Sequence, residues 1–313
     1  MIDQFGKVGI LYGGLSSERK ISLMSGLSIY ESLKNKDVNV HLFDTGKKTL
    51  SELENSEFDR VFIALHGRYG EDGCIQGVLE LLRIPYTGSG PIASNLAMNK
   101  VLAKQIWLQN NLPTPPFLIL KKNHDFSFIA KKLGFPFVFK PTQEGSTIGI
   151  NKVNDDSHIN DAYIDSLKYS FEVFAEKFIT GRELTVVVSK QKETIQCLPI
   201  IEIIAPNGNY SYENKYFSDK TRYCCPANLK LEIKQNIVNI SEMAFSVLGC
   251  DGWARLDIIL DKENQAWILE INTLPGMTNH SLVPMAASRI GISYQQLCLK
   301  ILKQASCKIH SFK

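Results

Sequence analysis

The stretch WARLDIILDKENQAWILEINTLPGMT, residues 253–278, decides how the rest of the chain is organised. Each half alternates polar and apolar residues, and successive side chains of a β-strand point to opposite faces. The pattern therefore predicts two antiparallel strands, and we place a two-residue turn at Glu263-Asn264 between them. Pro275 and Gly276 end the second strand.

This predicted hairpin sets two carboxylates against each other. With the turn at that position, Asp257 lies opposite Glu270 and Arg255 lies opposite Asn272. Opposed like charges destabilise a sheet, and a divalent cation between them would remove that cost. Carboxylate and amide oxygens suit Mg²⁺, which keeps coordination positions free for phosphate. The alternative is an ordinary hairpin with a solvated polar face, but Arg255 beside the acids and the Pro-Gly stop favour an active site.

Bulk composition excludes several classes of protein. The chain has 313 residues, enough for two or three domains, with 44% apolar and 21% charged residues. A net charge of +3 without Lys/Arg runs argues against nucleic acid and anionic membranes as partners, and no apolar run approaches a membrane span. Seven scattered cysteines without C-x-x-C, and an N-terminus without signal-peptide character, indicate reduced thiols in a cytoplasm.

The N-terminal part alternates strands and helices. Apolar runs at residues 7–12, 38–43 and 60–65 are typical of short buried strands, with helical patterns between them. This order predicts a doubly wound parallel sheet, whose ligands bind beyond the carboxyl ends of the strands. Two polar clusters follow those ends, GGLSSER at 13–19 and HGRYGEDG at 66–73. Neither is a dinucleotide-binding G-x-G-x-x-G motif or a P-loop.

Glu18 and His66 are the candidate functional residues of these clusters. Glu18 stands at a predicted helix start, where a carboxylate either caps the helix or meets a substrate ammonium. His66 follows a strand, where it acts as an acid, a base or a phosphate donor, or is structural. The sequence leaves both pairs of alternatives open.

A second unit begins near residue 98 with an amphipathic helix over 98–112. Three prolines within 113–116 mark a linker, because the residue before a proline is pushed to extended geometry. A strand, a helix and a strand follow, and Lys140 ends the last strand before the loop QEGSTIGI. This loop, which contains Ser146, either folds over phosphate oxygens through backbone N–H groups or is a plain glycine hairpin.

The next stretches supply candidate nucleoside contacts and a lid. VFAEKFITGRELTVVV is a strand, a break and a second strand; beside a phosphate site, Glu183 suits ribose hydroxyls and the backbone of 176–179 suits adenine. The aperiodic run 205–227 has the length of a functional lid, with Lys215 and Tyr216 at its centre.

Together these pieces predict a nucleoside triphosphate site without a Walker motif. The cations are Lys100, Lys140 and Lys215, the glycine-rich loop offers backbone donors, and the Asp/Glu/Asn set offers metal ligands. Lysines and Mg²⁺ are the general requirement of phosphoryl transfer, because they neutralise the charge of the phosphates.

Ten stretches of the chain resemble, in order and spacing, the D-alanine–D-alanine ligase family of the ATP-grasp superfamily. They are GGLSSER, ALHGRYGEDGCIQG, PYTGSG, MNK, FKPTQEGSTIG, EKFITGRELTV, ENKYFSD, GWARLD, LEINTLPGMT and HSLVPMAA. The resemblance implies an α/β and α+β chain. A Rossmann-like, doubly wound parallel-sheet domain (1–97) precedes a two-lobed ATP-grasp fold with a central domain (98–181) and a C-terminal domain (182–313). Residues 305–313 are expected to be a frayed tail.

The resemblance also implies a reaction, an ADP-forming ligation of a carboxylate to an amine. ATP phosphorylates the carboxylate of one D-alanine, and the amine of a second attacks the acyl phosphate. The product, D-alanyl-D-alanine, is a peptidoglycan precursor for cell wall biogenesis and cell shape. The implied cofactors are ATP and two Mg²⁺ or Mn²⁺ ions, and the implied protein is a cytoplasmic homodimer without nucleic-acid or membrane partners.

The resemblance assigns roles to individual residues. The first D-alanine ammonium meets Glu18 in a set with Ser146 and Tyr216, and His66 belongs to the substrate site. The oxyanion is stabilised by Arg255 and the Gly276 N–H, and the second carboxylate is held by Ser281 and the Leu282 N–H. The phosphate contacts are Lys100, Lys140 and Lys215. The adenine contacts are Glu176, Lys177 and Ile179, with Glu183 on the ribose. The metal ligands are Asp257, Asn272 and a bridging Glu270.

Three other activities compete with this interpretation. A ligase that takes D-serine or D-lactate as acceptor differs only through Tyr216 and its loop, because pocket shape sets selectivity. A silent nucleotide-binding protein would lack a metal ligand, Arg255 or a phosphate lysine, and all are present. A bare ATPase would have no use for Glu18, Ser146 and Tyr216.

Overall fold

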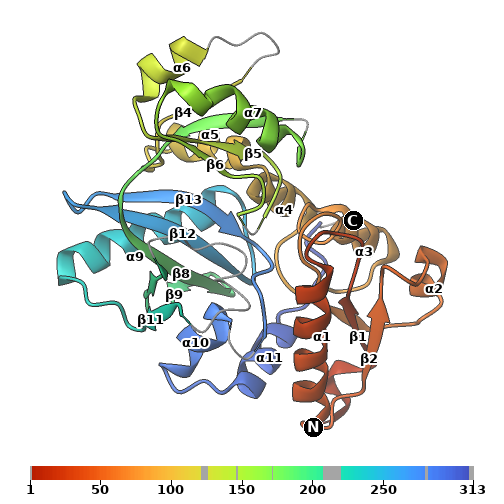
Figure 1. The fold of residues 1–313 in the computed structure, drawn as a ribbon. Helices are drawn as coiled ribbons and strands as arrows, with labels where there is room; N and C mark the ends of the chain where they lie inside the picture. Colours follow the sequence, from red (N-terminus) through yellow and green to blue (C-terminus); the bar gives the residue numbers. More distant parts are fainter. Residues whose placement is uncertain are drawn as a thin grey trace.

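The computed structural model describes residues 2–120, 126–145, 147–170, 172–206, 220–278 and 281–309. Within these residues the strands form three sheets, which occupy separate parts of the molecule (Figure 1). None of the helices in this part of the chain is long and apolar enough to cross a bilayer. Three predicted site residues, Ser146, Lys215 and Tyr216, lie outside the described residues.

The N-terminal sheet is parallel, as predicted, with strand order β2-β1-β3. Its strands are β1 (Val8–Tyr12), β2 (Val40–Asp44) and β3 (Arg60–Ile63). Its helical elements are η1 (Ile2–Phe5), α1 (Arg19–Lys34), α2 (Leu50–Glu54), α3 (Cys74–Leu82) and α4 (Pro91–Met98). Because the strands are parallel, their carboxyl ends share one edge, and both polar clusters of the sequence follow that edge.

The central sheet is antiparallel, with strand order β4-β7-β5-β6. Its strands are β4 (Phe117–Ile119), β5 (Phe137–Pro141), β6 (Asn151–Val153) and β7 (Val173–Lys177). The accompanying helices are α5 (Lys100–Gln109), α6 (Phe126–Leu133), η2 (Asp156–His158) and α7 (Ile159–Leu167). The helix expected from residue 98 begins later, because Asn99 Oδ1 accepts the N–H groups of Val101 and Leu102 at 3.1 Å each and caps α5.

The C-terminal sheet follows the order β11-β10-β8-β12-β13, and β9 pairs with β8. Its strands are β8 (Gly181–Gln191), β9 (Thr194–Cys197), β10 (Ile201–Ile204), β11 (Arg222–Cys224), β12 (Trp253–Asp261) and β13 (Ala266–Asn272). The helices are α9 (Leu231–Val247), α10 (Leu282–Ser288) and α11 (Tyr294–Lys303).

The register of the β12–β13 hairpin at the site is as predicted, but the predicted turn is wrong. Asp257 pairs with Glu270 and Arg255 with Asn272. Nearer the turn, Leu260 pairs with Ala266, so the loop is longer than the two residues expected, and Asn264 takes a positive φ of 64°. A register shift between Asp257 and Ile258 compensates. A β-bulge adds one residue to one strand, so it restores the pairing that the longer loop displaces.

Two further expectations need correction. The run 205–227 is not one long loop, because β11 lies within it and pairs with β10. The tail is not frayed as far as residue 309. Ser306 forms a bridge with Tyr86, and Lys308 Nζ lies 2.8 Å from Asp251 Oδ2. These contacts tie the chain end to the N-terminal sheet, which explains why the segment is ordered.

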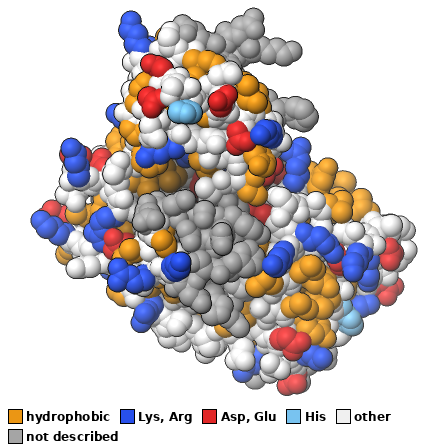
Figure 2. Space-filling model, in the orientation of Figure 1, with side chains coloured by type: hydrophobic (Ala, Val, Ile, Leu, Met, Phe, Trp, Pro, Cys, Tyr) orange, Lys and Arg blue, Asp and Glu red, His pale blue; other side chains and the backbone are white. Residues whose placement is uncertain are grey.

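Three apolar clusters of buried residues accompany the three sheets. The largest runs from the N-terminal sheet into α10 and α11 and includes residues of β8 and β10, so these parts share one core. The second joins the C-terminal sheet to α9 and to Trp107 of α5. The third, between the central sheet and its helices, is small. On the face shown in Figure 2 acidic and basic side chains are interspersed, which agrees with the low net charge.

Candidate active site

A pocket with an empty volume of about 610 Å³ draws its walls from all three parts of the chain. The N-terminal clusters, the start of α5, the loop after β5 and the β12–β13 hairpin all contribute. The lining residues are Glu18, His66, Glu71, Ala97, Met98, Lys100, Glu144, Gly145, Arg255, Glu270, Ile271, Asn272, Thr273 and Gly276. Seven of the predicted site residues are therefore brought together here: Glu18, His66, Lys100, Arg255, Glu270, Asn272 and Gly276.

The hairpin wall is built around the Asp257 carboxylate. Arg255 lies two residues before Asp257 on the same strand face, and its Nε and Nη2 donate to Oδ1 at 3.0 Å and to Oδ2 at 2.9 Å. The hydroxyl of Thr185, on the neighbouring β8, donates to Oδ1 at 2.7 Å. A paired guanidinium and a hydroxyl thus hold one carboxylate of the opposed pair in a fixed orientation.

The other carboxylate of the pair, Glu270, faces the start of α5. Lys100 Nζ lies 3.0 Å from Glu270 Oε2 and also donates to the backbone oxygen of Glu144 at 2.5 Å. Each acid of the hairpin therefore has its own cation, which offsets the like-charge repulsion across the strands. Asn272 Oδ1 accepts the Leu274 N–H at 2.9 Å, and this bond turns the chain towards the Pro-Gly segment.

Glu18 faces the pocket and does not cap its helix. It occupies the N-cap position of α1, but its side chain makes no capping hydrogen bond. The carboxylate is buried, and a Cβ atom added to Gly145 would lie only 2.8 Å from Glu18 Oε1. Gly145 thus lets the loop after β5 approach this carboxylate closely. The helix-capping alternative is not the observed arrangement.

His66 is buried in a network that spans the chain. Its Nδ1 lies 2.9 Å from the carbonyl oxygen of Leu274 and 3.4 Å from Glu71 Oε1, and its Nε2 lies 3.1 Å from Ser25 Oγ. Burial lowers the pKa of His66, but the hydrogen bond and charge of Glu71 outweigh it and raise the pKa overall. Burial also raises the pKa of Glu71. The two buried groups therefore share charge at the pocket wall.

The second predicted lysine, Lys140, ends β5 and pairs with the neighbouring strand β7. Its Nζ lies 2.5 Å from Glu176 Oε2. The other oxygen of Glu176 lies 2.7 Å from Nζ of Lys104, a residue that the sequence interpretation did not single out. Burial raises the pKa of Glu176, but the charges of Lys104 and Lys140 outweigh it, so the net pKa is lowered and the carboxylate is ionised.

The remaining predicted residues surround this centre. The backbone N–H of Lys177 donates to the Pro116 oxygen at 2.9 Å, Ile179 follows the end of β7, and Glu183 lies on β8. Ser281 precedes α10, whose first residue is Leu282. Ser281 Oγ accepts the Thr278 N–H at 2.9 Å, and a Cβ atom at Gly276 would lie 3.1 Å from it.

Three residues of this region were missed in the sequence. Glu71 lies inside HGRYGEDG but was not separated from its neighbours. Lys104 follows Lys100 by four positions, on the same helix face as the buried Trp107, so a lysine on an apolar face was the available signal. Ser25 carried no signal, because a serine inside a helix is ordinary and its partners are distant in the chain.

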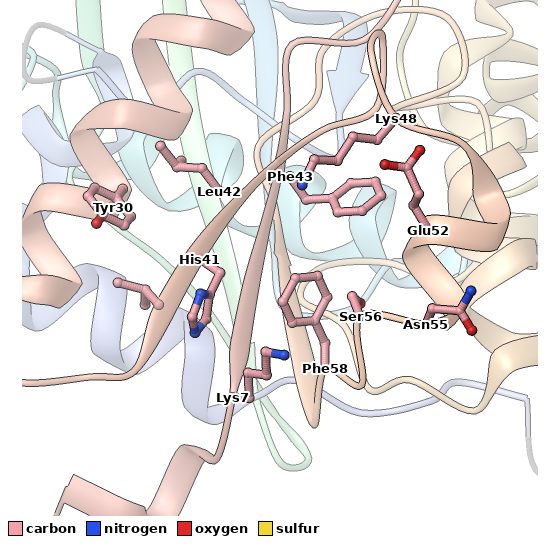
Figure 3. Close-up of a pocket in the computed structure, with 11 residues that line it drawn as sticks. Lys7, Tyr30, His41, Leu42, Phe43, Lys48, Glu52, Asn55, Ser56 and Phe58 are labelled. Atoms are coloured by element: carbon pink, nitrogen blue, oxygen red, sulfur yellow. The ribbon is translucent and has the colours of Figure 1, made fainter.

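A larger hollow, with an empty volume of about 950 Å³, runs along the outer edge of β2 (Figure 3). Phe43 and Phe58 meet edge to face in it, with ring centroids 6.1 Å apart. Lys48 lies over the ring of Phe43 and Lys7 over that of Phe58. These contacts are surface packing along the strand edge, away from the carboxyl ends of the parallel strands, and we place the active site in the smaller pocket.

Comparison with known proteins identifies relatives over nearly the whole chain. Residues 44–89 match the family described as D-ala D-ala ligase N-terminus, and residues 106–303 match D-ala D-ala ligase C-terminus. A D-alanine–D-alanine ligase of Bordetella pertussis is 54% identical over 311 residues, which cover 99% of this chain and 98% of the relative. One from Cupriavidus pinatubonensis is 47% identical over 305 residues, covering 97% and 93%.

Solved structures agree with these sequence relatives. The crystal structure of a D-alanine–D-alanine ligase from Bacillus anthracis, also solved in complex with ATP, superposes with a TM-score of 0.83 at 32% identity and covers 95% of this chain and 96% of that one. The VanG D-Ala:D-Ser ligase from Enterococcus faecalis superposes with a TM-score of 0.83 at 25% identity, covering 96% and 99%.

Two antiparallel sheets with lysines and carboxylates on their strands, preceded by a parallel-sheet domain, define an ATP-dependent ligase of the ATP-grasp type. The chain belongs to the D-alanine–D-alanine ligase family. This confirms the fold class and the family resemblance predicted from the ten sequence stretches, and it excludes the silent-binder and bare-ATPase alternatives at the level of family.

Proposed function

We propose that this chain uses ATP to join two D-alanine molecules through D-alanyl phosphate, releasing ADP and phosphate. D-alanyl-D-alanine formed in this way is a precursor of peptidoglycan. The observation that carries the proposal is the pocket itself. It sets Glu18 and His66 of the N-terminal domain against Arg255, Glu270 and the residues that follow them on the hairpin.

The reaction needs an activated carboxylate, because a free carboxylate is a poor electrophile and an acyl phosphate is a good one. In the proposed complex, Glu18 pairs with the ammonium of the first D-alanine, in a set that includes Ser146 and Tyr216, and His66 lies at the same substrate. Arg255 and the Gly276 N–H then stabilise the negative oxygen that develops when the second amine attacks. The position of Gly276 and Arg255 on one pocket wall supports this assignment.

The second D-alanine would be held by its carboxylate, through Ser281 and the Leu282 N–H. Both residues lie at the start of α10, where backbone N–H groups are free of intrahelical partners. The contact between Gly276 and Ser281 supports this placement, because it brings the proposed acceptor site beside the proposed oxyanion site.

The nucleotide would bind between the central and C-terminal sheets. Lys100 and Lys140, with Lys215, would contact phosphate oxygens. The backbone at Glu176, Lys177 and Ile179 would meet adenine, and Glu183 would meet the ribose. The placement of these residues on strands of both sheets supports the assignment. It also supports the three-domain division at residues 1–97, 98–181 and 182–313, since each range contains one sheet.

The hairpin acids suit two Mg²⁺ or Mn²⁺ ions. Opposed Asp257 and Glu270 carboxylates beside the Asn272 amide form a set of hard oxygen donors, and we propose that Glu270 bridges two ions. Among the described residues no three His, Cys, Asp or Glu side chains cluster as ready metal ligands, so substrate phosphates would complete the coordination. The ions would supply neutralisation of phosphate charge.

D-serine and D-lactate are the alternative acceptors. The curated relatives are named for D-alanine, which favours D-alanine here, although one structural relative is a D-Ala:D-Ser ligase. Tyr216, the residue that distinguishes these acceptors, lies outside the described residues. We also propose a homodimer that acts in the cytoplasm, where ATP is supplied; light scattering of the purified chain tests the assembly.

The decisive experiment measures ADP release from Mg·ATP by the purified chain, with and without D-alanine, and identifies the product by mass. We expect ADP release that depends on D-alanine, with one D-alanyl-D-alanine per ADP. Release only when D-serine or D-lactate accompanies D-alanine would move the acceptor assignment. The absence of any ATP turnover would overturn the proposal.

A further inference from the structure

The side chain of Lys104 is fully buried, one helical turn after the pocket residue Lys100. Its Nζ lies 2.7 Å from Glu176 Oε1 and donates to Thr114 Oγ1 at 2.6 Å. A buried ammonium without partners would be very costly, and packing alone gives no reason for a lysine at this position. The partners of Lys104 therefore indicate what it does.

Glu176 is held from two sides. Lys140 Nζ lies 2.5 Å from Oε2, while Lys104 holds Oε1, and the carboxylate itself is buried. Two ammonium groups against one carboxylate leave a net charge of +1 on this cluster, which we call the Lys104–Glu176–Lys140 cluster. Without Lys104, Glu176 and Lys140 would neutralise each other, and Lys140 would have no net positive charge to offer an anion.

The cluster is also anchored to the opposite sheet. Thr114 accepts the bond from Lys104 and donates its own hydroxyl proton to the Ile268 carbonyl of β13 at 2.8 Å. The Ile268 N–H donates in turn to the Pro113 carbonyl at 2.9 Å. Lys104 thus links β7 of the central sheet to β13 of the C-terminal sheet, two residues from Glu270.

We propose that Lys104 is a positioning residue for nucleotide binding: its charged ammonium holds the Glu176 carboxylate and keeps Lys140 available to the phosphates of ATP. This rests on the proposed function, because it takes Lys140 as a phosphate contact. Lys104 is too deeply buried to touch the nucleotide, so it acts only through Glu176 and Lys140.

The surroundings of Lys104 give this role a pH signature. Burial and the charge of Lys140 on β5 lower the pKa of Lys104 to about 8, although Glu176 on β7 and Glu270 on β13 oppose the decrease. Lys100, on the same helix, is the remaining charged group nearby and is paired with Glu270. As the pH rises through about 8, the cluster loses its positive charge. Nucleotide affinity therefore falls on the alkaline side.

The test compares Lys104→Met with the wild-type chain. Methionine has a similar length and no charge. We measure the Kd of Mg·ADP by calorimetry between about pH 7 and pH 10, and the steady-state constants for ATP and D-alanine. At neutral pH we expect Kd and the KM for ATP to rise about tenfold or more, the equivalent of one lost charge-assisted contact. We expect kcat and the KM for D-alanine to change less than about threefold.

The matched control is Thr114→Val, which removes a bond to the same ammonium but keeps the charge. We expect it to lose stability while its Kd and its alkaline inflection stay close to those of the wild type. If Thr114→Val weakens nucleotide binding as much as Lys104→Met does, Lys104 has only a structural role.

The wild-type pH profile keeps the test valid even if Lys104→Met does not fold. A flat Kd between about pH 7 and pH 9.5 would overturn the inference, as would an unchanged inflection in a folded Lys104→Met variant. Failure of the wild type to bind Mg·ADP at any pH would instead overturn the proposed function. The two failures are therefore distinguishable.

Discussion

Replacement of Glu270 by glutamine separates the chemistry of the hairpin from its stability. Glu270 Oε2 lies 3.0 Å from Lys100 Nζ, and Glu270 pairs directly with Asp257 across the strands. The change keeps the size and hydrogen-bonding capacity of the side chain. It removes one negative charge, and with it both an attraction and a repulsion.

The two electrostatic effects nearly cancel in the free protein. At an effective dielectric constant of about 20, a unit pair roughly 4 Å apart interacts by about 4 kcal/mol, which approximates the attraction to Lys100. The repulsion from Asp257, roughly 5 Å away as an opposed pair, is about 3 kcal/mol on the same scale. The net loss is therefore about 1 kcal/mol, and the expected fall in Tm is less than about 4 °C.

The effect on catalysis is much larger. Removal of one preorganised electrostatic contact with the reacting groups costs about 2.7–4 kcal/mol, which is a factor of about 10² to 10³ in kcat. We expect D-alanine-dependent ADP release by Glu270→Gln to fall by this factor, with a higher Mg²⁺ concentration needed for half-saturation. The coupled ADP assay, repeated across Mg²⁺ concentrations, measures both quantities.

Glu263→Gln is the matched control, because Glu263 lies in the exposed turn of the same hairpin. It should leave turnover, Mg²⁺ dependence and Tm unchanged. Normal turnover by Glu270→Gln would refute the metal assignment. A large loss of Tm in that variant would show that the charge balance derived from Lys100 and Asp257 is wrong.

Three further predictions follow from buried contacts. Ser25→Ala removes a hydroxyl 3.2 Å from the Met277 N–H and 3.1 Å from His66 Nε2, so we expect kcat to fall about fivefold to tenfold in steady-state assays with little change in the KM for ATP, and an equal rise of that KM would argue against a role in placing the Pro-Gly segment. Trp107→Ala empties a fully buried site and should cost about 3–5 kcal/mol in urea unfolding; a loss below about 1 kcal/mol would show that the site collapses. Arg19 lowers the pKa of Asp44, so this carboxylate contributes stability above its unfolded pKa of about 3.9 that is lost as the pH falls through its lower folded pKa. Asp44→Asn should therefore be less stable than the wild type at pH near 7 by urea unfolding, and the difference should shrink below about pH 4; a constant difference would contradict this sign.

The elements of the fold were predictable because their signals are local. The alternation of apolar and polar residues in 253–272 specified a hairpin, and the periodic apolar residues between the first strands specified helices. The exact turn was not predictable, because loop length and a bulge offset each other, and both preserve the pairing of Asp257 with Glu270.

Part of the site was also predictable from sequence. Asp257, Glu270 and Asn272 are arranged by strand geometry alone, because side chains two residues apart share a face. The ammonium-binding role of Glu18 was one of two alternatives in the sequence. Only the fold shows that its side chain turns away from the helix end and lies against Gly145.

The sequence by itself determined the strands, the helices and the pairing of acids on one hairpin, because each depends on residues within one or two turns of the chain. Only the tertiary structure decided that His66 lies 2.9 Å from the carbonyl of Leu274, a contact across 208 residues, and that Lys104 is shared by two sheets. Such contacts depend on how domains dock, and docking is set by the shape and charge of whole surfaces rather than by any local pattern of residues.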